Sequence, residues 1–169
     1  MKRLLLIVMA IALVAVGTTA QVTKESRAAR KAKMAKDIEV LMTNSHFGVV
    51  VNEAYPRGLS PIAINYDRGF TVHGDSLYSN LPYYEGSYQL SSSRDKSLRF
   101  NVMMEKCVIG KRRNGQWVAK IKAHDESDTY RYELTVNTNG RIDLSVRTGK
   151  GRAIRYTGIL TTGFKKTEE

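Results

Sequence analysis

Four tyrosines crowd into a short stretch around Pro82, and their side chains are the first candidates for chemistry in this sequence. Exposed tyrosine rings can stack on sugar rings or hold a peptide, because each combines a rigid aromatic surface with a polar tip. Pro82 cannot donate a hydrogen bond to a strand ladder, so the stretch is a strand end, an edge or a bulge. The predicted ligand-binding residues are Tyr78, Tyr83, Tyr84 and Tyr88, with packing at the end of a hydrophobic core as the alternative.

Other residue types that hold metals or drive catalysis are few and dispersed. His46, His73 and His124 lie far apart in sequence without the spacing of a metal site, so we predict neither a metal nor a cofactor. The sequence contains no nucleophile elbow, no phosphate-binding Walker loop and no zinc-protease motif. This pattern favours a non-catalytic protein, and a hydrolase without a recognisable motif is kept as an alternative.

A cluster of carboxylates occupies one predicted loop, formed by Asp125, Glu126 and Asp128. Such oxygen-rich clusters are typical of calcium sites, but the twelve-residue pattern of an EF-hand is absent. A polar hairpin loop explains the same residues without any ion. The sequence leaves both interpretations open.

The N-terminus has the three parts of a secretory signal peptide, assigned to residues 1–20. Two basic residues precede an apolar run over 4–16, and small residues then precede a cleavage site between Ala20 and Gln21. The apolar run is shorter than the roughly 20 residues that cross a bilayer, which disfavours a membrane anchor. Cys107 is the only cysteine, so neither a lipid-anchored N-terminus nor an internal disulfide is expected. We predict a periplasmic or secreted protein with no transmembrane segment in the mature chain.

The chain is strongly basic, with 27 lysines and arginines against 16 aspartates and glutamates and a formal net charge of +11. Removing the signal peptide takes away two cations from this total and leaves +9. In a cytosolic protein such a charge would suggest a nucleic-acid partner, which export puts out of reach. The partners that fit are an anionic glycan, lipopolysaccharide or an envelope protein, unless the charge is only a solvated surface.

Residues 21–45 form the predicted N-terminal segment, with a basic helix over Lys24–Thr43. Its apolar residues fall on one stripe at helical spacing, namely Ala28, Ala32, Ala35, Ile38, Leu41 and Met42. Cations load the first turns, which is the unfavourable end of the helix dipole. In one interpretation the stripe docks on the rest of the domain. In the other, the helix lies on an anionic membrane surface, although it has no large aromatic residue to insert.

From His46 onward the apolar residues recur with a period of two, which predicts a single β domain over 46–162 and a polar tail over 163–169. Tripeptides that end in glycine interrupt this alternation at 67–69, 113–115, 138–140 and 149–151. Each predicts a three-residue hairpin loop, because glycine takes the third, left-handed position without steric cost. Gly74 and Asp75 predict a two-residue turn.

The register of the hairpins follows from which residues must share the buried face. A three-residue loop at 138–140 pairs Leu134 with Leu144, whereas a two-residue loop would set Val136 against Asp143. The same reasoning throughout predicts a mainly β fold. We expect an antiparallel up-and-down meander of about ten strands that forms a barrel or two packed sheets, with one N-terminal α-helix.

Two further loops place Ile121 between two neighbours. A four-residue loop at 125–128 pairs it with Tyr132, and the loop at 113–115 pairs it with Cys107. All three side chains then share the predicted buried face, which supports both loop assignments.

Two of the predicted glycine loops have further consequences for the strands beside them. The loop at 67–69 separates two predicted strands, Pro61–Tyr66 and Phe70–His73. The loop at 113–115 also sets Trp117 opposite Lys111, so its register is the least consistent of the set. Both expectations depend on the glycine tripeptides acting as turns.

The order of these features resembles a secreted Bacteroidetes family catalogued as domain of unknown function 4251. The resemblance rests on the valine-rich stretch after Phe47, the Gly74-Asp75 hairpin and the run Leu81-Pro82-Tyr83-Tyr84. Toward the C-terminus it continues through Leu134-x-Val136, Ile142-x-Leu144-x-Val146 and Ile154-x-Tyr156. It covers about residues 30–160 and implies an exported, mostly β protein. It implies no activity and no catalytic residues.

These observations predict an exported, non-catalytic binding or interaction domain of the bacterial envelope. One alternative is a structural or assembly protein that binds anionic envelope surfaces through its basic face. The hydrolase without a recognisable motif is the other alternative. Each of these three functions uses different exposed side chains. The arrangement of the strands therefore decides which residues could bind a ligand or a surface.

Overall fold

The computed structural model describes residues 26–84, 97–149, 151 and 153–163. The signal peptide, its cleavage site between Ala20 and Gln21, and Tyr88 lie outside the described residues. What the sequence predicts for them therefore stays a prediction.

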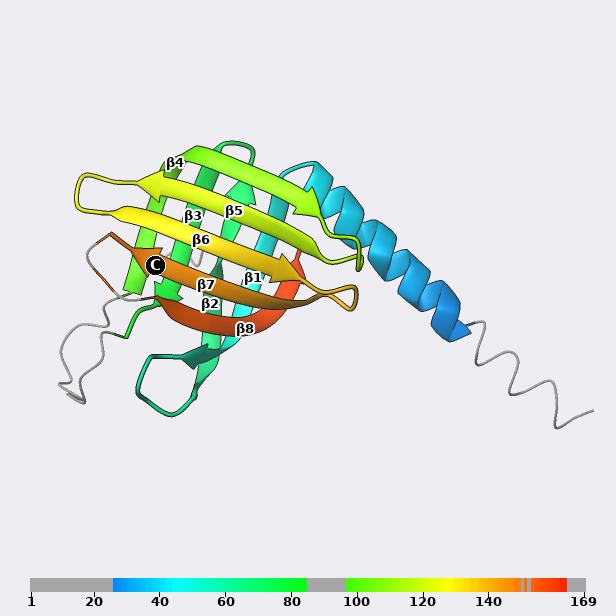
Figure 1. The fold of residues 1–169 in the computed structure, drawn as a ribbon, viewed down its shortest axis with the longest axis horizontal. Coiled ribbons are helices and arrows are strands. Elements are labelled where there is room, and N and C mark those ends of the chain that lie inside the picture. Colours follow the sequence, from blue (N-terminus) through cyan, green and yellow to red (C-terminus); the bar gives the residue numbers. More distant parts are fainter. Residues whose placement is uncertain (1–25, 85–96, 150, 152, 164–169) are drawn as a thin grey trace, which may run out of the picture.

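The strands form a closed antiparallel barrel in which each described strand pairs with the next in sequence (Figure 1). The ring is closed because β8 also pairs with β1. In chain order the strands are β1 (His46–Tyr55), β2 (Ile62–His73), β3 (Ser76–Pro82), β4 (Ser97–Lys111), β5 (Trp117–His124), β6 (Thr129–Val136), β7 (Arg141–Thr148) and β8 (Ile154–Thr161). Closure removes the sheet edges that would otherwise pair with other chains. The predicted antiparallel meander is confirmed, and of its two packings the barrel is correct.

The barrel has eight described strands rather than about ten, because two pairs of predicted strands are continuous. β2 runs through the whole of Ile62–His73, so the hairpin predicted at 67–69 is wrong. β4 joins the strand around Phe100 to the first strand of the C-terminal meander, with a register shift near Glu105. A bulge lets a long strand bend, and β4 pairs first with β3 and then with β5.

Hairpin loops set the register of the C-terminal half as the sequence predicts. Gly115 and Gly140 both have left-handed φ angles, of 82° and 77°. Leu134 lies opposite Leu144, and Ile121 lies between its two expected partners on β4 and β6. The apolar set of each of these strands therefore faces the barrel interior.

β1 lies unusually close to both of its neighbours. A Cβ on Gly69 of β2 would lie 1.8 Å from the carbonyl oxygen of Val49, and a Cβ on Gly158 of β8 would lie 2.0 Å from that of Val50. The pairing of β1 with both neighbours also shifts register around Asn52. Glycines and a bulge let a sheet bend sharply enough to close into a small barrel. Gly69 therefore permits a close approach of two strands, and not the turn expected from its tripeptide.

Replacing either of these glycines should stop β1 from lying between its neighbours. We expect Gly69→Ala or Gly158→Ala to cost about 3 kcal/mol or more of unfolding free energy, or to abolish folding, because the new methyl group overlaps backbone atoms. Gly110→Ala is the matched control, since a Cβ there has no atom within 4 Å. Denaturant unfolding followed by circular dichroism measures all three variants. Equal stabilities would contradict the close approach.

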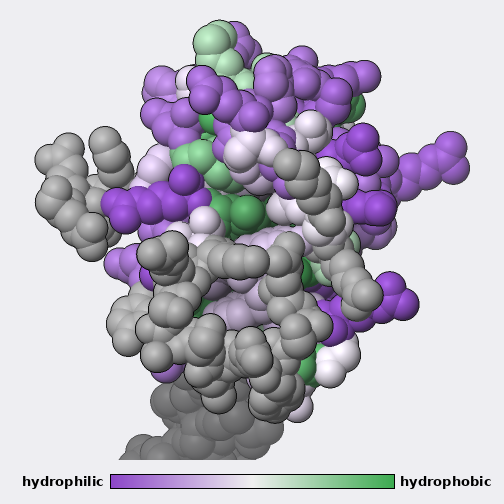
Figure 2. Space-filling model, turned by 90° about the vertical axis from the view of Figure 1, so that its left-hand side faces the viewer, coloured by the Kyte–Doolittle hydropathy of each residue, from purple (hydrophilic) through white to green (hydrophobic). Residues whose placement is uncertain are grey.

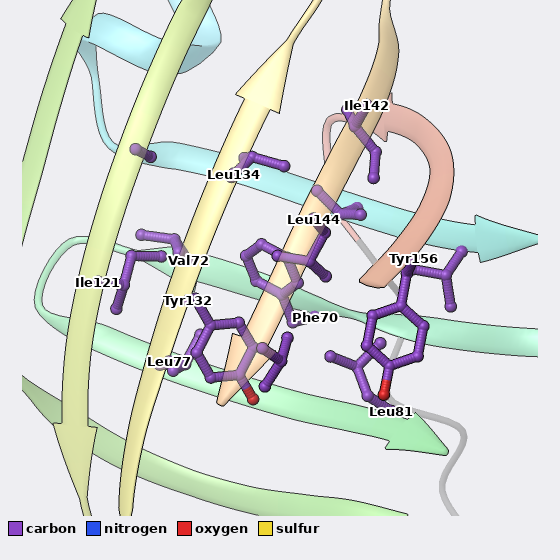
Figure 3. Packing of buried hydrophobic residues seen from close by; sticks show 14 of the residues in the cluster. Phe70, Val72, Leu77, Leu81, Ile121, Tyr132, Leu134, Ile142, Leu144 and Tyr156 are labelled. Carbon is purple, nitrogen blue, oxygen red and sulfur yellow. The ribbon is translucent and has the colours of Figure 1, made fainter. Parts of the chain in front are cut away.

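Alternate side chains of the strands fill the interior of the barrel (Figure 3). Phe70 packs edge-on against Tyr132, with ring centroids 5.3 Å apart. The hydroxyl of Tyr132 lies 2.8 Å from that of Ser79, and the hydroxyl of Tyr156 donates to the carbonyl oxygen of Pro82 at 2.6 Å. Burial raises the pKa of both tyrosines, so these hydroxyls stay protonated and keep their partners. The inside of the barrel is a packed core.

The N-terminal helix is described over residues 26–43 and leads away from one end of the barrel (Figure 1). Ile38 and Met42, in its last turns, are buried against the strands. The exposed residues of the predicted apolar stripe are Ala28, Ala32 and Ala35. The predicted docking of the stripe is therefore confirmed for Ile38, Leu41 and Met42. It is wrong for the three alanines, because the first turns extend past the strands. No helix among the described residues is long and apolar enough to span a membrane.

Candidate functional site

The described candidate tyrosines, Tyr78, Tyr83 and Tyr84, do not share one surface. Tyr83 is only 8% exposed, and its hydroxyl lies 3.5 Å from that of Thr148 inside the end of the barrel. Tyr78 on β3 has a buried residue on each side in sequence, so it points to the outer face. Tyr84 is half-buried against the core. Core packing accounts for Tyr83, while ligand binding by the others stays a prediction and Tyr88 lies outside the described residues.

A groove of about 310 Å³ lies where the end of the helix meets β4 and β5. Its lining residues are Met42, Thr43, Ser45, Cys107, Ile109 and Trp117. Burial, and then the charge of Asp75, raise the pKa of Cys107, which favours a protonated thiol packed as a small hydrophobic group. Lys111 lies 5.3 Å above the ring of Trp117 and 3.3 Å from Glu39. Lys111 and Trp117 are paired as predicted, and the cation–π contact makes this pairing favourable.

The carboxylate of Asp125 organises the loop between β5 and β6. Its Oδ1 accepts hydrogen bonds from the backbone N–H groups of Ser127 and Asp128, each at 2.8 Å, and from the Ser127 hydroxyl at 2.7 Å. Its Oδ2 accepts one from Tyr130 at 2.9 Å. Burial raises the pKa of Asp125, but these hydrogen bonds outweigh burial and lower it to about 2. The loop thus uses both oxygens itself, and the described part of the chain holds no group of three or more metal-ligating side chains.

Replacing Asp125 by asparagine should remove the stability that depends on its ionised carboxylate. The folded-state pKa of about 2 lies below the ordinary 3.8, so this contribution is full above about pH 5 and is lost as the pH falls toward 2. We expect Asp125→Asn to lower the melting temperature near neutral pH, and the gap from wild type to close in acid. Thermal unfolding over a pH series measures this gap.

The control for this prediction is Glu126→Gln, which removes the same charge from an exposed neighbour in the loop. Glu126 makes no hydrogen bond or ion pair with a described residue, so its replacement should leave the pH profile of stability unchanged. Equal effects of the two substitutions would mean that Asp125 acts only through net charge.

Four cations stand opposite one another on the outer face of neighbouring strands. Lys106 of β4 lies opposite Lys122 of β5, which lies opposite Arg131 of β6. Arg131 in turn lies opposite Arg147 of β7. We call these four exposed residues the cationic row. Adjacent strands are about 4.8 Å apart, so the row extends over about 14 Å along a narrow line around the barrel.

Few neighbouring charges compensate this row. Lys122 forms an ion pair with Glu105, and its hydrogen bond lowers the pKa of that carboxyl. Glu105 also lies 2.8 Å from Nδ1 of His124. The other three members of the row make no ion pair with a described residue. Like charges directly opposite each other destabilise a sheet, so folding alone does not account for the row.

The row lies on the outer face, near the loop that joins β5 to β6. Seen from the barrel end farthest from the helix, the described surface is largely hydrophilic, with a small hydrophobic area between polar side chains (Figure 2).

Two histidines that are far apart in sequence meet in the fold. His46 and His73 are directly paired on β1 and β2, with ring centroids 4.2 Å apart. His124 lies elsewhere, beside Glu105 on the outer face. Sequence spacing missed the pair because the contact depends on the β1–β2 register. The sequence did contain a signal for this contact: His46 begins the predicted β domain, and His73 directly precedes the Gly74-Asp75 turn.

The barrel, its N-terminal helix and its basic outer face define a small antiparallel β-barrel domain. A family described as "Domain of unknown function (DUF4251)" matches residues 29–160 of the chain. The chain belongs to this DUF4251 family, which confirms the resemblance carried by its motifs. A search of the curated proteins gave no match.

A solved structure shares the fold. The crystal structure of a DUF4251 family protein from Bacteroides eggerthii DSM 20697 is similar with a TM-score of 0.61. The match covers 78% of this chain and 89% of that chain at 10% sequence identity. At this identity the likeness shows the fold, and any function must be argued from this chain's own residues.

Proposed function

We propose that this protein is an exported, non-catalytic domain that binds an acidic glycan of the bacterial cell envelope along the cationic row. The supporting observation is the line formed by Lys106, Lys122, Arg131 and Arg147, of which only Lys122 has an ion-pair partner among the described residues. A chain of anions lying on this line would relieve the repulsion between neighbouring strands. The unfavourable charge arrangement in the free protein then becomes favourable in the complex.

The shape of the charge favours a linear polymer over a flat surface. The row offers one cation per strand, at steps of about 4.8 Å. In the adjacent row of outward residues, Lys120 lies opposite Glu133, which lies opposite Ser145. That row ends on β8 at Arg155, so a carboxylate and a serine separate its two cations, whereas the cationic row carries a cation on every strand that it crosses. A line matches a single polyanionic chain better than it matches a membrane surface.

The filled interior supports a ligand on the outside of the barrel. The core side chains leave the buried hydroxyls paired with one another or with the backbone, so no buried side-chain polar atom among the described residues is left without a partner. A ligand inside the barrel would have to displace this packed core, whereas the cationic row is exposed and accessible.

Neutralising two members of the row should weaken glycan binding and strengthen the fold. The probe is alginate, a polymer of uronic acids, with dextran as the neutral polymer. We expect Arg131→Gln/Arg147→Gln to raise the Kd for alginate about tenfold at low ionic strength, equivalent to about 1.4 kcal/mol. The same variant should gain about 0.2–1 kcal/mol of unfolding free energy, because like charges no longer face each other. Isothermal titration and denaturant unfolding measure the two effects, and added salt should reduce both.

The matched control is Arg112→Gln/Arg113→Gln, which removes the same net charge from exposed residues beside the β4–β5 turn. This variant should bind alginate nearly as tightly as the wild type. Equal weakening by the two double variants would mean that net charge, and not the row, drives binding. Binding to phosphatidylglycerol vesicles without binding to alginate would contradict the choice of a glycan.

Export has its own test. The sequence of residues 1–20 supports cleavage before Gln21. When the full chain is expressed in a Gram-negative host, we expect the protein in the periplasm or the medium with Gln21 as its first residue. Intact-mass measurement and an N-terminal peptide identify the product. A cytosolic protein that retains residues 1–20 would contradict export.

A further inference from the structure

The start of β1 and the end of β2 bring two exposed imidazole rings together. His46 and His73 are direct partners in the ladder, their ring centroids are 4.2 Å apart, and the ring planes are inclined by 69°. Both side chains are exposed to solvent. An ion in solution can therefore reach both rings at once.

The fold holds these two backbone positions in place. The next pair along the ladder is Phe47 with Val72, and both side chains are fully buried in the core. On the other side, the N–H of Gly74 donates a hydrogen bond to the carbonyl oxygen of Ser45 at 3.1 Å. The two histidines thus lie between a buried pair and a hydrogen bond that joins two turns. Because these positions are already fixed, less conformational entropy is lost when a ligand binds.

A hydrogen bond to the backbone determines which nitrogen of His46 is available. Nδ1 of His46 lies 2.6 Å from the carbonyl oxygen of Asn44. A carbonyl oxygen only accepts hydrogen bonds, so Nδ1 must carry the hydrogen. In the neutral ring this leaves the lone pair on Nε2, which is free to bind a cation. Metal-binding histidines commonly donate their second ring nitrogen to a backbone carbonyl in this way.

We propose that His46 and His73 form a surface site for a divalent transition-metal ion, with Cu²⁺ as the tightest-binding ion and Zn²⁺ and Ni²⁺ weaker. Imidazole is a preferred ligand of these three ions, and affinity for nitrogen ligands rises along the series to Cu²⁺. The rings meet edge to face in the free protein, so one ring turns about its side-chain torsions when the ion binds.

The protein supplies two ligands, and water or an external ligand supplies the rest. No group of three or more His, Cys, Asp or Glu side chains suited to a metal occurs within residues 26–84 and 97–149 or the described positions beyond them. A site with two ligands differs from a structural zinc site, which has four protein ligands and holds its ion permanently. The ion at this site exchanges with solvent, and its binding strengthens the junction of β1 and β2.

The test is titration of the untagged mature protein with CuCl₂, ZnCl₂ and MgCl₂. Isothermal titration should give one Cu²⁺ per chain, weaker binding of Zn²⁺ and no binding of Mg²⁺. Electron paramagnetic resonance of the Cu²⁺ form should show nitrogen ligands, and the melting temperature should rise with added Cu²⁺. Each of His46→Gln and His73→Gln should weaken Cu²⁺ binding at least about tenfold, because each removes one of only two protein ligands.

The control is His124→Gln, which alters an exposed histidine held by Glu105 and should leave Cu²⁺ binding unchanged. Nuclear magnetic resonance of the wild type gives the same answer without any variant. Substoichiometric Cu²⁺ should broaden the ring signals of His46 and His73 before those of His124. Loss of binding in His124→Gln, or broadening that begins at His124, would overturn the site. So would unchanged Cu²⁺ affinity in both of the other variants.

Discussion

The close approach of β1 to both neighbouring strands is the constraint on which the rest of the barrel depends. A sheet of eight short strands closes only if it bends strongly somewhere. Here the bend falls at β1, where Gly69 and Gly158 leave room for backbone oxygens of the adjacent strand. With this seam closed, every described strand has two neighbours, and the inward side chains of β1, β6 and β7 are buried in one core.

Because the interior of the barrel is filled, a ligand is expected to bind on the outside of the molecule. Tyr132 and Tyr156 occupy the space where a larger barrel would hold a ligand, and their hydroxyls are already bonded. The charges that lack partners among the described residues lie on the outer face instead. There the strand register, fixed by the buried face, also fixes the spacing of the cationic row. The strand pairing that packs the core therefore also sets the positions of the four cations on the surface.

Turn chemistry predicted the C-terminal half well, because each short loop fixes both its register and the buried face. The expected pairing of Ile121 with Cys107 and Tyr132 already implies the neighbouring contacts of Lys122, so the row could have been found from sequence. The N-terminal half was less predictable. Gly69 has the sequence context of a turn but serves a close approach to β1, which depends on the register of the β1–β2 ladder. The contact between His46 and His73 depends on the same register.

Native-state amide hydrogen exchange along β1 is the most direct test that the barrel is closed. The account predicts that the amides between Gly48 and Val51 exchange only through global unfolding. Their opening free energy should equal that from denaturant unfolding, as should that of the amides of β6. Markedly faster exchange in β1 and β8 than in β6, with little dependence on denaturant, would show a seam that opens locally and would contradict the account.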